Sequence, residues 1–101
     1  MVRPDPESWD AVADRLETIR EALGMEKGEI AEAIGVSASQ WTNYIKADNL
    51  IPVHAANRLC RLAGVTTDYI YRGILKVVID PDMHPKLLGA PPVRKPRRAR
   101  G

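Results

Sequence analysis

Apolar residues recur at helical spacing along most of the chain up to Gly73, and glycines or capping residues interrupt the pattern. The first such segment begins after Ser8, a candidate N-cap, and ends at Gly24. Its apolar face consists of Trp9, Val12, Ala13, Leu16, Ile19 and Leu23. We expect this helix to form the floor of a core, with Trp9 buried in register with the others. The alternative is that Trp9 is an exposed anchor for a partner.

A second, shorter helix follows and ends at a tight glycine turn. Its apolar stripe consists of Ile30, Ala31 and Ile34, with Glu29 and Glu32 on the polar side. Gly35 comes next, and glycine reaches positive φ without steric cost, so we expect it to end this helix and to act as the pivot into the next. Val36 can then fill the corner. Ala31 supplies the small side chain that two steeply crossing helices need where their axes approach.

A third helix is expected to begin at Ser37, which starts a Ser-x-x-Gln sequence that ends at Gln40. In such a capping box the serine oxygen caps the glutamine N–H, while the glutamine side chain reaches back to the serine. The expected inward residues are Trp41, Tyr44 and Ile45. The outward residues, which are small, polar or basic, are Ala38, Ser39, Thr42, Asn43 and Lys46.

Two further helices complete the pattern. Residues 47–51 read as a loop, and Pro52 suits the first turn of a helix that runs to about Ala63 and stops at Gly64. Its expected inward residues are Val53, Ala56, Leu59, Cys60 and Ala63. Thr66 or Thr67 then opens a short fifth helix that contains Tyr69 and Ile70. The sequence therefore predicts an all-α, compact five-helix bundle.

These segments resemble the Cro/repressor-type (XRE-like) helix-turn-helix family of prokaryotic and phage transcription regulators, over residues about 13 to 73. The resemblance rests on residues 30–37 at the turn, residues 41–44 in the helix after it, Ile51-Pro52, and residues 63–73. It implies a lambda-repressor-like domain, here residues 8–73, that binds double-stranded DNA sequence-specifically. It also implies a small regulator, expected to be a repressor, that acts as a homodimer on a palindromic operator.

By this resemblance the helix that begins at Ser37 enters the major groove by its N-terminal end. Ala38, Ser39 and Asn43 would then lie closest to base edges. Asn43 can pair with adenine through two hydrogen bonds, Ser39 can bond several bases, and Ala38 can touch a thymine methyl. The candidates for the DNA backbone are Lys27, Ser37, Thr42 and Lys46. Gln40, if its side chain is occupied in the cap, would contact a phosphate or nothing.

The chain departs from the family pattern at both ends of this motif. Lys27 stands where the family commonly has glutamine. A lysine can still contact a phosphate, but it cannot brace a neighbouring base-contacting side chain as a glutamine can. Gly28 weakens the same helix start. After Tyr44, Ile45 and Ala47 stand where an acidic residue and a glycine are usual. These two residues leave the exit from the recognition helix open.

Charge is distributed unevenly along the chain. Residues 1–35 carry 4 basic and 9 acidic groups, whereas residues 36–61 carry 3 basic and 1 acidic group. Residues 91–101 carry 5 basic residues and no acid, so the overall net charge of +2 comes from the C-terminal end. An acidic back and a mildly basic front would steer DNA toward the third helix. The alternative for the acidic groups is that they only solvate the first helix.

Residues 74–89 form a C-terminal arm in this reading, and residues 90–101 a disordered basic tail. The run from Ile74 to Ile79 is β-branched and could pair as a strand with a second subunit, extend the fifth helix, or pack over the domain as an irregular arm. The arm is also apolar enough to hold a protein partner, as in an antitoxin or anti-repressor. The tail could sit against phosphates or serve solubility alone.

Other classes of function find little support. No run of 18 apolar residues and no signal-peptide pattern is present, so we expect a cytoplasmic protein with no membrane contact. Cys60 is the single cysteine and is expected to be a packed thiol. His54 belongs to no metal-spaced set, and the trio Asp80, Asp82 and His84 is interrupted by proline. We expect no enzyme, no metal and no cofactor. RNA binding is disfavoured because Trp41 and Tyr44 are expected to be buried rather than free to stack.

Overall fold

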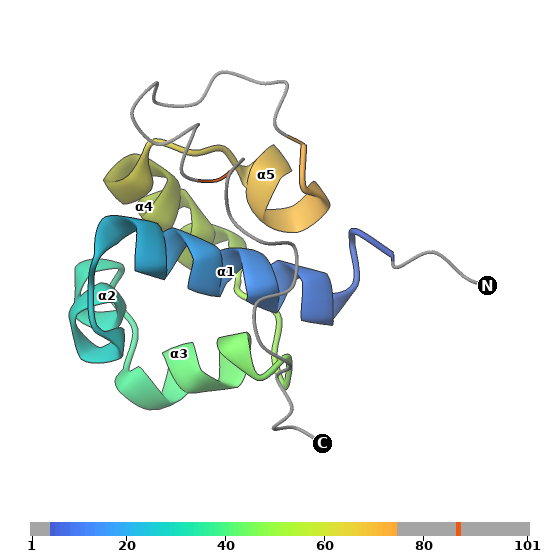
Figure 1. The fold of residues 1–101 in the computed structure, drawn as a ribbon. Helices are drawn as coiled ribbons and strands as arrows, with labels where there is room; N and C mark the ends of the chain where they lie inside the picture. Colours follow the sequence, from blue (N-terminus) through green and yellow to red (C-terminus); the bar gives the residue numbers. More distant parts are fainter. Residues whose placement is uncertain (1–4, 75–86, 88–101) are drawn as a thin grey trace.

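The computed structural model describes residues 5–74 and residue 87 of the 101-residue chain. The described residues form five α-helices and no strand: α1 (Trp9–Leu23), α2 (Lys27–Ala33), α3 (Ala38–Ile45), α4 (Val53–Ala63) and α5 (Thr67–Arg72). Helix α1 runs between α3 and α5, which lie below and above it in Figure 1. It packs against α3 and α5, while α2 packs against α3 and α4. The predicted all-α five-helix fold is confirmed.

Most helix ends coincide with the predicted capping residues. The Ser8 hydroxyl oxygen accepts a hydrogen bond of 3.1 Å from the Ala11 N–H at the start of α1. Thr66 does the same for α5, accepting from the Tyr69 N–H at 3.2 Å. Pro52 is the N-cap of α4, one residue before the predicted first turn. The Ser8 and Thr66 oxygens satisfy N–H groups that lack a partner within the helix, so they determine where α1 and α5 begin. Pro52 makes no side-chain hydrogen bond at the start of α4.

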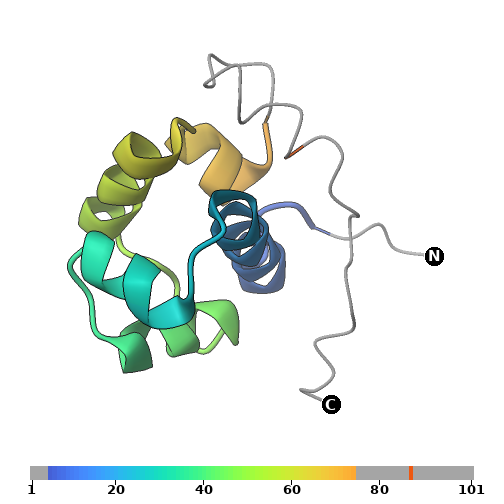
Figure 2. The same ribbon diagram turned by 60° about the vertical axis from the view of Figure 1, so that its left-hand side comes forward.

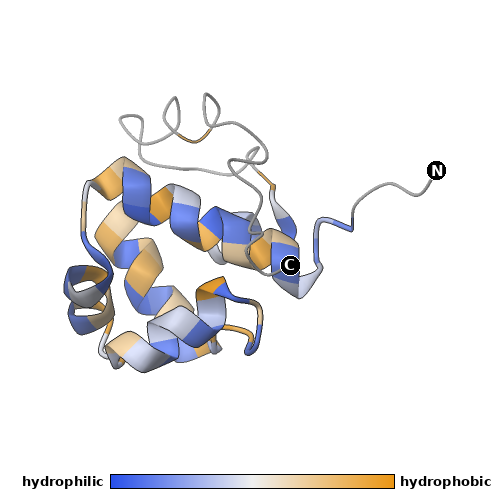
Figure 3. Cartoon of the chain, turned by 60° about the horizontal axis from the view of Figure 1, so that its bottom comes forward, coloured by the Kyte–Doolittle hydropathy of each residue, from blue (hydrophilic) through white to orange (hydrophobic). Residues whose placement is uncertain are grey.

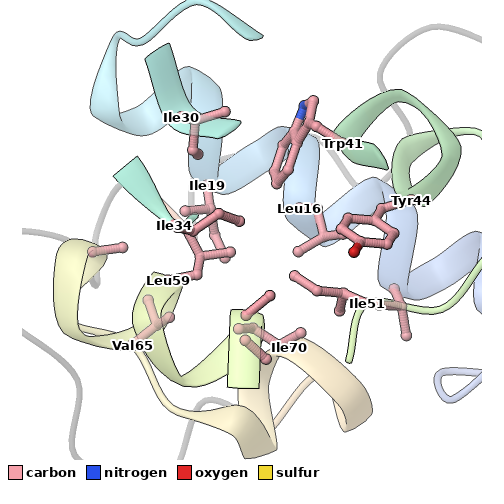
Figure 4. Close-up of a cluster of buried hydrophobic side chains, with 14 of the residues drawn as sticks. Leu16, Ile19, Ile30, Ile34, Trp41, Tyr44, Ile51, Leu59, Val65 and Ile70 are labelled. Carbon is pink, nitrogen blue, oxygen red and sulfur yellow. The ribbon is translucent and has the colours of Figure 1, made fainter. Parts of the chain in front are cut away.

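A single apolar cluster holds the helices together. Its fully buried large side chains come from every helix and from the segment between α3 and α4 (Figure 4): Leu16, Ile19, Ile30, Ile34, Trp41, Ile51, Leu59 and Ile70. Each buried side chain of this size contributes about 1.5 to 3 kcal/mol relative to exposure. The helical periodicity of the sequence identified most of this core.

The prediction that Trp9 and Val53 belong to the core was wrong. Trp9 is 49% exposed and Val53 is 62% exposed. Each is the first residue of its helix, so it lies in register with the apolar face but at the edge of the packed region, where less of the neighbouring structure covers it. In α4, Ala55 is fully buried as well as the predicted Ala56. Cys60 is partly buried against the core, and this burial raises the pKa of its thiol.

Side chains also join the N-terminal segment to α5. Arg15 Nε donates a 2.9 Å hydrogen bond to the Ile70 carbonyl oxygen, and its Nη2 donates to the Pro6 carbonyl oxygen. Desolvation of the guanidinium lowers the pKa of Arg15. An exposed ion pair of 3.5 Å between Arg72 and Glu7 links the same parts of the chain. The beginning and the end of the domain are therefore held together.

Beyond Ile74 the structure describes Leu87, which is 6% exposed and belongs to the core cluster. The predicted strand at residues 74–79, the trio at residues 80–84 and the basic tail at residues 90–101 lie outside the described residues, except for Ile74. Within the described part, no helix is long and apolar enough to cross a bilayer. The same residues contain no group of three or more His, Cys, Asp or Glu side chains placed to hold a metal ion.

Candidate nucleic-acid interface

The turn between α2 and α3 is fixed by backbone and side-chain hydrogen bonds. Gly35 has a φ of +78°, which side chains with a Cβ rarely adopt. The Val36 N–H donates to the Ala31 carbonyl oxygen at 2.9 Å, which closes the end of α2. From α4, Arg58 Nη1 donates to the Ile34 carbonyl oxygen at 3.2 Å. The glycine pivot predicted from the sequence is confirmed, and α4 braces it.

The start of α3 is the predicted capping box. Ser37 Oγ accepts from the Gln40 N–H at 3.0 Å, and Gln40 Oε1 accepts from the Ser37 N–H at 2.8 Å. Both side chains remain exposed. The side-chain oxygen of Gln40 is therefore occupied, whereas its Nε2 forms no hydrogen bond with another described residue. The Ser37 hydroxyl keeps its own proton available for donation.

Two aromatic side chains hold α3 on the rest of the domain. Trp41 is fully buried and Tyr44 is 6% exposed. Figure 4 shows them next to Leu16 of α1 and Ile51. Their burial removes them as stacking platforms for single-stranded bases. The Trp41 Nε1–H is buried with no hydrogen-bond partner among the described residues, which costs about 1 to 3 kcal/mol.

The opposite side of α3 faces solvent. Ala38, Ser39 and Lys46 are exposed, and Thr42 and Asn43 are half-buried. No acidic residue occurs in α3, and Figure 3 shows the helix mostly in pale and blue tones. The Asn43 side-chain amide has no hydrogen bond to another described residue, although its main-chain oxygen accepts from Asp48 and Asn49. The predicted outward residues thus lie together on one accessible face.

Lys27 is the first residue of α2 and is exposed. Beside Lys27 lies a hydrogen bond that sequence analysis missed. Glu29 Oε1 accepts it from the Glu26 N–H at 2.7 Å. The Glu-x-x-Glu spacing was the available signal, since a glutamate three residues after an N-cap is part of the capping-box pattern. This hydrogen bond stabilises the start of α2, where Gly28 is a weak helix former.

The two basic side chains of α1, Arg15 and Arg20, are bonded to other parts of the domain. Arg20 Nη2 lies 2.8 Å from Glu17 Oε1, and this hydrogen bond raises the pKa of Arg20. Arg15 is bonded to two carbonyl oxygens, as described above. Within α1 and α2, Lys27 is therefore the basic side chain that forms no hydrogen bond or ion pair with another described residue.

The exit from α3 has the geometry that a glycine would provide. Ala47 has a φ of +63° and is the only non-glycine residue with positive φ among those described. The Lys46 N–H donates to the Thr42 carbonyl oxygen at 3.0 Å, and the Ala47 N–H to that of Tyr44 at 3.2 Å. The sequence left the exit from α3 open, and in the structure the chain leaves α3 through Ala47 in the left-handed conformation.

Figure 2 shows α2 and α3 as neighbouring helices beside α1, and the two are in direct contact. This pair, with its glycine turn and capped second helix, defines a helix-turn-helix. Residues 11–69, more than half of the chain, match the family model described as a helix-turn-helix domain. The chain belongs to this family of XRE-like prokaryotic DNA-binding domains. Neither the comparison with curated proteins nor that with solved structures gave a match.

Proposed function

We propose that this chain is a small transcriptional repressor that binds a palindromic operator as a homodimer and reads base sequence through α3. The observation that carries the proposal is the two-sided character of that helix. Its aromatic side is buried, while its other side presents Ser39 and Asn43 without acidic neighbours in the helix. Polar side chains that are held on a rigid helix and have no internal hydrogen bond are suited to base edges.

In the proposed complex the N-terminal end of α3 enters the major groove. Ser39 and Asn43 lie four residues apart, so they project from the same side of the helix. Asn43 reads adenine through two hydrogen bonds, and a pair of this kind discriminates between bases by about 1 to 3 kcal/mol. Ala38 contacts a thymine methyl group, and Ser39 adds a hydrogen bond to a neighbouring base.

The remaining side chains of the interface position the protein on the DNA backbone. Lys27 approaches from the start of α2, while the Ser37 hydroxyl and Gln40 Nε2 donate from the start of α3. Thr42 and Lys46 contact phosphates farther along the helix. Such contacts raise affinity for any duplex and fix the register of the base-reading residues.

Binding of a random-sequence duplex over a range of salt concentrations tests the phosphate contacts. Each phosphate neutralised on B-DNA contributes about 0.9 to the slope of log K against log salt. Because this slope is negative, Lys27→Ala should make it less steep, reducing its magnitude by about 0.9. Arg61→Ala, which removes an exposed basic residue of α4, is the matched control and should leave the slope unchanged. Equal slopes for wild type and Lys27→Ala would remove Lys27 from the interface.

A further inference from the structure

The turn between α2 and α3 has little packing to hold it. Ile34, at the end of α2, is fully buried, and so is Trp41 in α3. Of the six residues between them, Val36 is half-buried and the other five are exposed. The geometry of this turn therefore depends more on hydrogen bonds than on burial.

Two neighbouring residues of α4 hold the end of α2. The side chain of Leu59 is fully buried next to that of Ile34 (Figure 4). Arg58 is exposed, and its Nη1 donates to the Ile34 carbonyl oxygen at 3.2 Å. That oxygen lies one residue before Gly35 and three before Ser37, the N-cap of α3. Arg58 forms no ion pair with a described residue, so the bond to Ile34 is what holds its guanidinium in place.

Gly35 leaves room for this guanidinium. A Cβ at residue 35 would lie 2.5 Å from Arg58 Nη1 and 3.5 Å from Arg58 Cζ. Because 2.5 Å is too short for a contact between these atoms, any side chain at residue 35 would push the guanidinium away from the Ile34 carbonyl oxygen. Glycine is therefore needed here for two separate reasons, its φ of +78° and the space that Arg58 occupies.

A small rotation at this turn would displace the side chains that are proposed to contact bases. Asn43 lies six residues after Ser37, which is about 9 Å along the helix at about 1.5 Å per residue. A rotation of about 10° about the start of α3 would move Asn43 by about 1.6 Å. N–H···O hydrogen bonds tolerate a range of only about 0.5 Å. Such a rotation would therefore break a two-bond pair with adenine.

We propose that Arg58 is a positioning residue for sequence reading: by holding Ile34 it sets the orientation in which α3 presents Asn43, without itself contacting DNA. The inference rests on the proposed function, because it concerns the geometry of α3 in the major groove. Trp41 and Tyr44 hold α3 itself on the core, whereas the bond from α4 holds the turn in front of it. Loss of this bond should therefore impair base reading more than folding.

The experiment measures binding of two duplexes of equal length and composition. One is the duplex that the wild-type chain enriches from random sequence, and the other is a scrambled version of it. Arg58→Ala should weaken binding to the enriched duplex by about tenfold, toward the lower end of what one two-bond base pair contributes. Binding to the scrambled duplex should change by less than about twofold, and its salt slope should not change, because no phosphate contact is lost.

The matched control is Arg61→Ala, which removes the same charge from another exposed arginine of α4. It should bind both duplexes like wild type. Arg58→Lys keeps a side-chain donor for the Ile34 carbonyl oxygen and should recover most of the discrimination between the duplexes. Circular dichroism checks that all variants are folded.

Gly35→Asn tests the same contact from the other side. Asparagine tolerates a positive φ better than most residues, but its Cβ would displace the Arg58 guanidinium. Gly35→Asn should therefore lose discrimination as Arg58→Ala does. Combining the two substitutions should reduce discrimination no further than Gly35→Asn alone, since both remove one contact.

An Arg58→Ala variant that discriminates between the duplexes like wild type would overturn the inference. Weaker binding to both duplexes, with a salt slope smaller in magnitude by about 0.9, would also overturn it, because Arg58 would then contact a phosphate directly. Equal loss of discrimination in Arg61→Ala would assign the effect to charge instead of to the bond with Ile34. Failure of the proposed function gives a different result, in which the wild-type chain itself enriches no duplex, and the inference then fails with it.

Discussion

The Tyr71 hydroxyl in α5 donates a 2.6 Å hydrogen bond to the Ile51 carbonyl oxygen, which lies ahead of α4. The two residues are 20 positions apart in sequence. This bond holds the segment that follows α3, so the exit of α3 is tied to the last described helix of the domain. Burial raises the pKa of Tyr71, because the neutral phenol is the form that the folded domain accommodates.

Tyr71→Phe should lower the free energy of unfolding by about 1 kcal/mol at neutral pH, because the hydrogen bond to Ile51 is lost. The raised pKa gives the pH dependence. The stabilisation is fully present below the unfolded-state value of about 10 and is lost as pH rises through the higher folded-state value. Urea unfolding across alkaline pH should show a smaller loss of stability in Tyr71→Phe than in wild type.

Tyr44→Phe is the control for this prediction. The pKa of Tyr44 is also raised by burial, but its hydroxyl forms no hydrogen bond to a described residue. At neutral pH it should therefore destabilise less than Tyr71→Phe. An alkaline profile of Tyr71→Phe identical to that of wild type would contradict the assignment.

Ser37→Ala should destabilise the domain by about 1 kcal/mol, because it removes the acceptor for the Gln40 N–H at the start of α3. Thermal unfolding measures the effect. Ser39→Ala is the matched control, since Ser39 is exposed in the same helix turn and caps nothing. It should leave stability within about 0.5 kcal/mol of wild type. Equal effects of the two substitutions would show that the cap does not determine where α3 begins.

Ala47→Gly should stabilise the domain or leave it unchanged. A residue with a Cβ in the left-handed conformation is strained by about 1 to 2 kcal/mol, and glycine removes this strain but adds about 0.4 to 1 kcal/mol of unfolded-chain entropy. Ala33→Gly, at an exposed helical position in α2, should destabilise by up to about 1 kcal/mol. Denaturant unfolding of both variants measures the two effects: Ala33→Gly should lower the free energy of unfolding, and Ala47→Gly should not. A clear loss of stability in Ala47→Gly would contradict the left-handed exit.

The two tryptophans should behave differently. Trp41→Ala removes a fully buried side chain and should destabilise by about 3 to 5 kcal/mol. Trp9→Ala should cost clearly less, because half of that side chain already faces water. In Trp9→Phe, emission comes from Trp41 alone and should resist quenching by acrylamide. Strong quenching in that variant would show that Trp41 is not seated in the core.

Local patterns in the sequence were sufficient to predict much of this fold. Gly35, the Ser37–Gln40 capping box and Thr66 act between residues close together in the chain, so their spacing alone indicates the structure. Trp9 and Val53 were placed wrongly because periodicity gives the face of a helix but does not show where the packed region ends. The exposure of a residue at a helix start depends on its neighbours in space.

The contacts that support the candidate site could not be predicted in this way. Arg58 bonds Ile34 from 24 positions away, and Tyr71 bonds Ile51 from 20. Side-chain to backbone bonds at such separations leave no periodic signature. Ala47 was recognised as a departure from the family pattern, but its positive φ required coordinates. The outward residues of α3 were predictable because burial of Trp41 and Tyr44 determines which side remains exposed.

Selection of random duplex DNA by the purified chain, repeated with Asn43→Ala, tests the central claim most directly. The control is Asn57→Ala, which alters an exposed asparagine of α4 outside the proposed interface. The account predicts an enriched palindromic motif whose specificity relaxes at one position of each half-site in Asn43→Ala and is unchanged in Asn57→Ala. The absence of any enriched motif, or a motif that Asn43→Ala leaves intact, would contradict sequence reading by α3.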